Sequence, residues 1–164
     1  MSDADPLLSA ADERSVSDMR IRPITPDLLE QIAALERVSF AQPWSARALE
    51  LLCGDTAFGF ACLAEEGVVA YGGMLTVLDE GQVTNIATHP AHRRCGYGAA
   101  IVAAMLEEAR RRDLAFVTLE VRESNLPAIA LYQKFGFEVV GRRPRFYTEP
   151  VEAALIMQCN LKGN

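Results

Sequence analysis

The stretch from Asn85 to Gly98, NIATHPAHRRCGYG, joins a predicted strand to a long predicted helix. The start of a helix presents free backbone N–H groups and the positive end of the helix dipole, and both favour a bound phosphate. Gly96 and Gly98 let the main chain approach a ligand closely, and Arg93 and Arg94 can add charge-assisted hydrogen bonds. The loop therefore suits a ligand that carries a diphosphate. An ordinary strand-to-helix turn with solvated arginines fits the same residues.

Two better-known phosphate loops do not match this stretch. A P-loop needs Gly-x4-Gly-Lys followed by Ser or Thr, and the sequence holds no such run. A dinucleotide fingerprint needs Gly-x-Gly-x-x-Gly, whereas alanines and no third glycine follow Gly98. The pattern present is Arg-x-x-Gly-x-Gly, which runs from Arg93 to Gly98.

Length and composition bound the class of protein. The 164 residues suffice for one domain with a substantial core, and 50% of them are apolar and 23% charged. A net charge of −6 argues against general nucleic-acid binding, and no apolar run is long enough to cross a bilayer. The four cysteines show no Cys-x-x-Cys spacing, and no signal peptide is visible. We therefore expect a cytoplasmic protein with reduced thiols and no direct contact with nucleic acid or a membrane. A monomer is expected as well, although no sequence pattern determines the oligomeric state.

Periodicity divides the chain into a leader and one domain. Residues 1–18 are rich in Ser, Asp and Ala and predict a disordered leader, which leaves residues 19–164 for a single domain. Strands are predicted at Met19–Ile24, Phe58–Ala64, Val68–Leu78, Gln82–Thr88, Phe116–Arg122, Phe137–Gly141 and Ala153–Cys159. Helices are predicted at Asp27–Ser39, from the cap Ser45 to Leu52, at Gly98–Arg112 and at Pro127–Phe135. This order predicts an α/β fold in which helices cover a mixed sheet.

Two predicted helices carry an apolar face. The helix over 27–39 places Leu28, Ile32, Leu35 and Val38 on one side. The helix over 98–112 has a longer stripe, made of Ile101, Val102, Met105, Leu106 and Ala109.

Glu120 is a candidate general base. Alternation along the strand over 116–122 places Val117, Leu119 and Val121 on one face and Glu120 on the other. A carboxylate inside an apolar strand costs stability unless it is held, and such groups often act as bases. A carboxylate paired with Arg122 or another cation explains the same residue.

Tyr132 is a candidate proton donor, because a phenol with a pKa of about 10 can protonate a leaving thiolate. A core aromatic ring stacked on Phe135 is the alternative. Asn125 precedes the predicted helix over 127–135 and suits its N-cap. Trp44, the single tryptophan, fits either core packing or the wall of a substrate groove.

His89, His92 and Cys95 recur at intervals of three, but this spacing in a glycine-containing loop is weak support for a metal site, and solvated loop histidines are preferred. No metal is expected. Cys95 lies near a helix start, which can lower the pKa of a thiol, and we interpret it as an inert side chain.

Several stretches, in order over residues 20–158, together resemble the GNAT acetyltransferase superfamily and its ribosomal-protein alanine N-acetyltransferase (RimI-type) branch. They are Phe40–Ser45 (FAQPWS), Asn85–Thr88 (NIAT), Arg93–Gly98 (RRCGYG), Leu119–Asn125 (LEVRESN) and Ala130–Phe137 (ALYQKFGF). The arginine–glycine loop is common to the whole superfamily. The first and fourth stretches are narrower and favour the alanine branch.

The resemblance implies a central, mostly antiparallel sheet of about seven strands flanked by about four helices. It implies that acetyl-CoA is the co-substrate, with Glu120 as general base and Tyr132 as general acid. The main chain of Ile86, Ala87 and Thr88 would pair with the pantetheine arm. Other cofactor contacts would come from Arg93, Arg94, Cys95, Gly96, Tyr97, Gly98, Ala99 and Asn125.

The acceptor implied by the resemblance is the N-terminal alanine of the eighteenth small-subunit ribosomal protein, with Trp44 and Tyr147 contacting it. Another protein N-terminus or a small-molecule amine is the alternative acceptor, and a non-catalytic CoA-sensing module is a third interpretation. The chain departs from the branch in having Glu152 alone where adjacent acids are usual, and Cys95 where a polar or basic residue is common.

Overall fold

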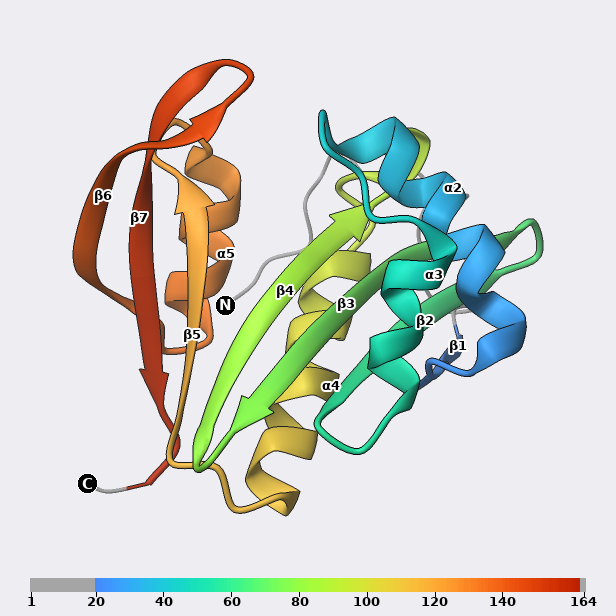
Figure 1. Ribbon diagram of the computed structural model, residues 1–164, viewed down its shortest axis with the longest axis horizontal. Coiled ribbons are helices and arrows are strands. Elements are labelled where there is room, and N and C mark those ends of the chain that lie inside the picture. Colours follow the sequence, from blue (N-terminus) through green and yellow to red (C-terminus); the bar gives the residue numbers. More distant parts are fainter. Residues whose placement is uncertain (1–19, 163–164) are drawn as a thin grey trace.

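The computed structural model describes residues 20–162, which form one seven-stranded sheet with helices on both faces (Figure 1). The strands are β1 (Arg20–Pro23), β2 (Ala57–Ala64), β3 (Gly67–Val77), β4 (Glu80–Thr88), β5 (Phe116–Arg122), β6 (Glu138–Thr148) and β7 (Val151–Asn160). The α-helices are α2 (Leu29–Ser39), α3 (Ala46–Leu49), α4 (Tyr97–Arg111) and α5 (Leu126–Lys134). The predicted leader and Met19 lie outside the described residues.

The sheet is mixed, as predicted. Its order is β1-β2-β3-β4-β5-β7-β6, and every neighbouring pair is antiparallel except the parallel pair β4–β5. One hydrophobic cluster lies under α4 and α5, and a second lies under α2 and α3 on the other face of the sheet (Figure 1). No helix among residues 20–162 is long and apolar enough to cross a membrane.

Three residues of the predicted apolar stripe, Leu28, Ile32 and Leu35, are buried at α2 and its N-cap. Val38 is 54% exposed, so its place in the apolar stripe is wrong. Leu29, Ala33 and Glu36 are also buried and, together with Ile32, follow the i, i+3, i+4 and i+7 spacing of one helical face. The acidic Glu36 therefore occupies a core position.

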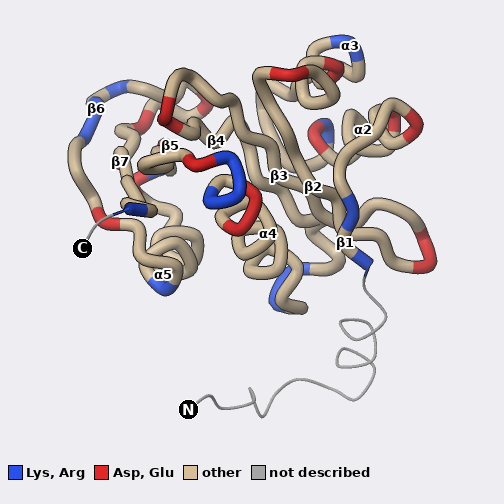
Figure 2. The backbone as a smooth tube through the Cα atoms, turned by 90° about the horizontal axis from the view of Figure 1, so that it is seen from below, with Lys and Arg blue, Asp and Glu red and all other residues tan. Residues whose placement is uncertain are grey.

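The helix α4 matches its prediction closely. Its buried residues include the whole predicted stripe, from Ile101 to Ala109. At its C-terminal end Arg111 and Arg112 pair with acidic residues one turn earlier, and this charged end faces the viewer in Figure 2. Cations there also oppose the negative end of the helix dipole. These arginines thus have a structural role within the helix.

The strands β4 and β5 separate soon after they pair. Their register contains Glu80, Gly81 and Gln82 of β4, and no later residue of β4 pairs with β5 in the described chain. From Val83 to Thr88 one backbone edge of β4 is therefore left open toward β5. Figure 1 shows the two strands diverging upward from this point.

A bulge in β4 accompanies the separation. Gly72 pairs with Ile86 and Met74 pairs with Val83, so β4 holds one more residue than β3 between these pairs. A Cβ on Gly73 would lie only 2.6 Å from Thr84 Oγ1, so glycine permits the close approach of the two strands. Bulges re-aim side chains, and this one lies at Thr84 and Asn85.

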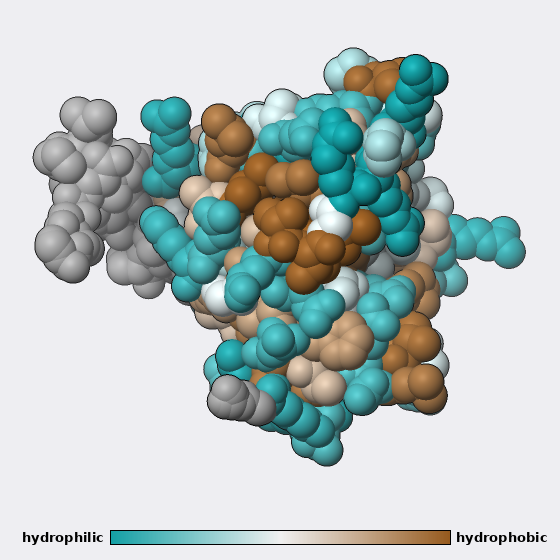
Figure 3. Space-filling view, turned by 90° about the vertical axis from the view of Figure 1, so that its left-hand side faces the viewer, coloured by the Kyte–Doolittle hydropathy of each residue, from teal (hydrophilic) through white to brown (hydrophobic). Residues whose placement is uncertain are grey.

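The strand β6 extends well beyond the predicted segment, which ended at Gly141. It is an edge strand, its residues are exposed along most of its length, and its register with β7 is irregular between Arg143 and Tyr147. A strand that is solvated on both faces shows no alternation, so the pattern was absent from the sequence. Val139 and Val140 of β6 are among the exposed hydrophobic residues. Figure 3 faces the β6 side of the molecule and shows apolar side chains gathered amid polar ones.

Candidate active site

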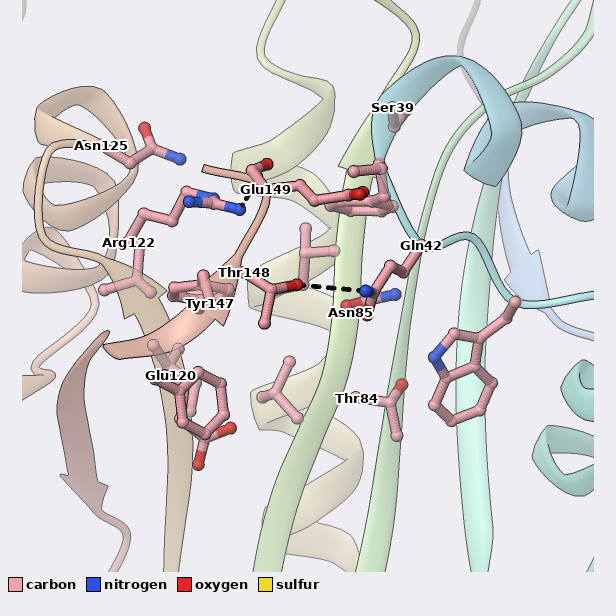
Figure 4. A pocket seen from close by; sticks show the side chains of 18 of the residues that line it. Ser39, Gln42, Thr84, Asn85, Glu120, Arg122, Asn125, Tyr147, Thr148 and Glu149 are labelled. Carbon is pink, nitrogen blue, oxygen red and sulfur yellow. Dashed lines mark hydrogen bonds between the residues drawn. The ribbon is translucent and has the colours of Figure 1, made fainter. Parts of the chain in front are cut away.

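A pocket of about 570 Å³ opens where β4 and β5 separate (Figure 4). Its walls come from β4, from β5, from the loop after α2 and from the turn between β6 and β7. Six residues singled out in the sequence line this one pocket: Trp44, Ile86, Glu120, Asn125, Tyr132 and Tyr147. The fold thus gathers in one place side chains that are spread over a hundred residues of the chain.

Glu120 lies on the β5 wall of the pocket and is exposed. The alternation was predicted correctly, since Val117, Leu119 and Val121 are buried, but the expected burial of Glu120 is wrong. The opposite face of β5 borders the open pocket and carries no covering helix. Arg122 does not neutralise Glu120, because it pairs with Glu152 at 3.1 Å. The carboxylate is therefore free to meet a ligand in the pocket.

Tyr132 is both a core residue and a pocket residue. Its ring is buried and packs edge-on against Phe137, with 5.8 Å between ring centroids, rather than against Phe135. Burial, and next the neighbouring Tyr147, raise the pKa of Tyr132 to about 12. The phenol therefore keeps its proton throughout the neutral range.

Tyr147 lies close to both candidates. Burial and the charge of Glu120 raise its pKa, and Arg122 opposes this effect. Figure 4 shows Glu120 and Tyr147 on the β5 side of the pocket, with Thr84 and Asn85 on the β4 side.

Trp44 fits both of its sequence interpretations. It is half-buried, packs on the hydrophobic cluster under α2 and lines the pocket. Ser45, the next residue, accepts a hydrogen bond from the Ala48 N–H at 3.1 Å and caps α3, as predicted. Asn125 likewise caps α5 through the Ala128 N–H at 3.3 Å.

The arginine–glycine loop lies outside the pocket, between β4 and the start of α4. Arg94 (φ 66°) and Gly96 (φ 83°) both adopt left-handed backbone conformations. Gly96 occupies the N-cap position of α4, and no side chain caps the N–H groups that follow it. Arg93 and Arg94 are exposed, and no acidic side chain within residues 20–162 pairs with them. This arrangement fits a diphosphate, since the start of α4 and two exposed arginines lie in one loop.

The other residues in and beside this loop have side chains that are small or partly or fully buried, so they present mainly backbone atoms to a ligand. The side chains of Ala87 and Tyr97 are buried in the two hydrophobic clusters. A Cβ on Gly98 would lie 3.7 Å from Thr88 Oγ1, so the end of β4 and the first turn of α4 are adjacent. Cys95 is half-buried, with its Sγ 3.7 Å from the carbonyl oxygen of Arg93. Ala99 follows in the first turn of α4.

The histidines beside this loop have local roles. His92 Nε2 lies 3.0 Å from Glu66 Oε2, and His89 Nδ1 accepts a hydrogen bond from the Ala91 N–H at 3.1 Å. Over the described part of the chain, no cluster of His, Cys, Asp and Glu is arranged to hold a metal ion.

Two features of the site are not indicated by any of the sequence motifs. The first is Glu36, fully buried behind the pocket and bonded to Asn85. Its position in the stripe that begins at Leu29 was the available signal. The second is the side-chain bond from Gln42 Nε2 to Thr148 Oγ1, 3.2 Å long, which joins the loop after α2 to the end of β6 (Figure 4). No local sequence pattern predicts a contact between residues so far apart in the chain.

Comparison with known proteins identifies relatives of this chain. The model of the acetyltransferase (GNAT) family matches residues 29–137. The ribosomal protein bS18-alanine N-acetyltransferase of Escherichia coli (strain K12) is 34% identical over 125 residues, which cover 75% of this chain and 84% of that protein. A relative with the same description from Haemophilus influenzae is 30% identical over 135 residues, covering 80% and 92%. The crystal structure of the ribosomal-protein-S18-alanine N-acetyltransferase from Escherichia coli is similar with a TM-score of 0.82, at 30% identity, covering 89% of this chain and 96% of that one.

Proposed function

The chain belongs to the acetyltransferase (GNAT) family and is an acetyl-CoA-dependent N-acetyltransferase, and from this premise we propose that it acetylates the N-terminal alanine of ribosomal protein bS18. The relatives described above carry that activity in their names. The observation that carries the proposal is the pocket in which Glu120, Tyr132 and Trp44 meet beside the open edge of β4.

On the donor side, the proposal assigns acetyl-CoA to β4 and α4. The open edge from Ile86 to Thr88 offers backbone groups to the amides of the pantetheine arm, much as an added strand would. The start of α4 from Gly96 to Ala99 receives the diphosphate at the positive end of the helix dipole, and Arg93 and Arg94 supply charge. Asn125 contacts the cofactor near its reactive end, where α5 meets the pocket.

On the acceptor side, the proposal assigns the N-terminus to the part of the pocket between the loop after α2 and the β6–β7 turn. Trp44 and Tyr147 form aromatic walls there. An alanine side chain is small enough to fit beside two such rings without displacing them. The pocket also contains the acids Glu120 and Glu149, which favour a cationic N-terminus as it approaches.

In the proposed reaction the amine nitrogen attacks the carbonyl carbon of the thioester directly. Glu120 takes a proton from the amine, either directly or through a water, as the new C–N bond forms. The C–S bond breaks, and Tyr132 donates its phenolic proton to the departing sulfur. The raised pKa of Tyr132, about 12, keeps that proton in place before the reaction.

The chemistry of the site also favours an α-amine over a lysine. Only a neutral amine attacks a thioester, and an α-amino group has a pKa near 8 whereas lysine has one of about 10.4. Deprotonation at neutral pH then costs about 1.4 kcal/mol for the first and about 4.6 kcal/mol for the second. A single exposed carboxylate is a sufficient base for deprotonating the α-amine.

A peptide panel tests the proposed acceptor. The protein is incubated with acetyl-CoA and with peptides that begin Ala-Arg or Ser-Arg or that carry one internal lysine behind a blocked N-terminus. Mass spectrometry then locates any added acetyl group. We expect acetylation of the alanine α-amine first. Acetylation of the lysine alone would contradict the proposal.

A further inference from the structure

Glu36 is the one charged side chain that the described residues bury completely, at 0% exposure. A buried carboxylate is costly unless hydrogen bonds replace its lost water. Three donors do so here: the backbone N–H of Trp44 at 2.8 Å to Oε1, the Asn85 side-chain amide at 2.8 Å to Oε2, and the Tyr71 hydroxyl, also to Oε2. Within residues 20–162 no basic side chain pairs with it.

These donors belong to different parts of the fold. Trp44 lies in the loop after α2, Tyr71 in β3, and Asn85 in the bulge of β4. Trp44 and Asn85 line the active-site pocket, whereas Glu36 and Tyr71 lie behind it. Burial, and next the charge of Glu36, raise the pKa of Tyr71 far above its usual value, so the phenol stays a donor. Glu36 therefore ties two pocket walls to the core.

The carboxylate also fixes the orientation of the Asn85 amide. An ionised carboxylate only accepts hydrogen bonds, so the NH2 group of Asn85 must turn toward it. The amide oxygen, Oδ1, then points to the other side of the planar group. Because Asn85 lines the pocket, this leaves a hydrogen-bond acceptor on the β4 wall, across from Glu120 on β5 (Figure 4).

Two other polar atoms near Asn85 have no partner in the described chain. The hydroxyls of Ser39 and Thr84 are buried and have no hydrogen-bond partner among the described residues, and both residues line the pocket. Thr84 is the neighbour of Asn85 in the bulge, and Ser39 ends α2. Buried hydroxyls are rarely left unpaired, and Thr84 Oγ1 lies against Gly73 of β3, so the bulge is a polar part of the β4 wall.

We propose that Glu36 is a positioning residue for the acceptor amine: it holds the Asn85 amide so that Oδ1 receives one N–H of that amine. Asn85 is then the residue in contact with the substrate, and Glu36 acts through it. This inference rests on the proposed function, because it requires an amine in the pocket. It adds a contact on β4 to the aromatic walls and to Glu120.

A double-mutant cycle tests the coupling. Glu36→Gln keeps the size of the side chain but presents an NH2 group, which favours a turned Asn85 amide with its own NH2 toward the pocket. We expect the acceptor KM to rise about tenfold with kcat and the acetyl-CoA KM close to wild type, as for the loss of one hydrogen bond. Asn85→Ala should raise the acceptor KM by a similar factor. The double variant should be no worse than either single variant, because both changes remove one contact.

Tyr71→Phe is the matched control. It removes a donor from the same carboxylate oxygen but leaves the bond to Asn85 intact. We expect a lower Tm with a near wild-type acceptor KM. If Glu36 has only a structural role, the acceptor KM should rise in every variant in proportion to the fall in Tm, Tyr71→Phe included. That outcome would overturn the proposal.

The remaining outcomes are also decisive. Additive effects of Glu36→Gln and Asn85→Ala would show that Glu36 does not act through Asn85. If Glu36→Gln does not fold, Asn85→Ala alone still decides, since a wild-type acceptor KM in that variant contradicts the proposed contact. A wild-type protein that acetylates none of the peptides would contradict the proposed function instead, so the two failures are distinguishable.

Discussion

The guanidinium of Arg122 lies over the ring of Tyr147, with Cζ 4.3 Å from the ring centroid. The same group donates hydrogen bonds to the carbonyl oxygens of Glu149 at 3.2 Å and Pro150 at 3.0 Å, and it pairs with Glu152 at 3.1 Å. One residue at the end of β5 thus holds both an aromatic wall of the pocket and the turn that closes it. We call these contacts of Arg122 the Arg122 clamp. Glu152 also accepts a hydrogen bond from the Ser124 N–H at 2.7 Å, so Glu152 connects the clamp to the loop after β5.

Arg122→Lys should loosen the acceptor side of the pocket. Lysine cannot reproduce the planar fork or the stacking on Tyr147. We expect the acceptor KM to rise about fivefold to tenfold, from the loss of roughly 1 kcal/mol, with the acetyl-CoA KM unchanged. Steady-state kinetics with an Ala-Arg peptide measures this. Arg142→Lys is the control, because Arg142 pairs with Glu123 on the surface, and equal effects of the two changes would argue against a clamp.

Glu120→Gln should slow acetylation most at low pH. The base is needed to remove a proton from an amine with a pKa near 8, and the need falls as the pH rises and free amine accumulates. We expect a loss of about a hundredfold in kcat/KM near pH 6.5 and a much smaller loss near pH 9. The control Glu149→Gln changes another acid of the pocket and should keep the shape of the wild-type profile. A uniform loss for Glu120→Gln across the pH range would remove Glu120 from the role of base.

Tyr132→Phe should lower kcat while the fold and acetyl-CoA binding persist. The substitution removes the hydroxyl but keeps the edge-on packing against Phe137. Since the pKa of Tyr132 is raised to about 12, its proton-donating form dominates at every pH below that value. The wild-type rate should therefore show no fall due to this group up to about pH 10. An unchanged kcat in the variant, measured with a folded protein, would show that another donor protonates the sulfur.

Acetyl-CoA should protect Cys95 from alkylation. Cys95 is half-buried in the loop that we assign to the diphosphate, whereas Cys62 and Cys159 are buried in the core. Exposed Cys53 is the internal control; burial and the acids Glu50 and Asp27 raise its pKa, so it should label slowly but equally with and without acetyl-CoA. Mass spectrometry of iodoacetamide-treated protein resolves the sites. Equal labelling of Cys95 in both conditions would place the cofactor elsewhere.

The fold was predictable where a segment is buried on one face. The strand β5 and the stripe of α4 follow directly from period-two and helical alternation, and both predictions are confirmed. The strand β6 was cut short because a solvated edge strand carries no such signal. Hydrophobic periodicity arises from the burial of one face, so it does not predict a strand whose faces are both exposed.

The site was predictable as a set of residues but not as an arrangement. Glu120 and Tyr132 were singled out, yet the exposure of Glu120 depends on the separation of β4 and β5, which only the sheet register reveals. Glu36 was missed for a related reason. Its burial depends on Trp44, in the loop after α2, and on Tyr71 and Asn85, which are far from it in the sequence. Tertiary hydrogen bonds of that kind leave no local pattern.

The most direct test of the central proposal uses the whole acceptor protein. Unacetylated small-subunit ribosomal proteins are incubated with this enzyme and isotope-labelled acetyl-CoA, and the labelled protein and its labelled residue are then identified by mass spectrometry. The account predicts label on the α-amine of the N-terminal alanine of bS18. Label on lysine side chains, or on other proteins with bS18 unlabelled, would contradict it.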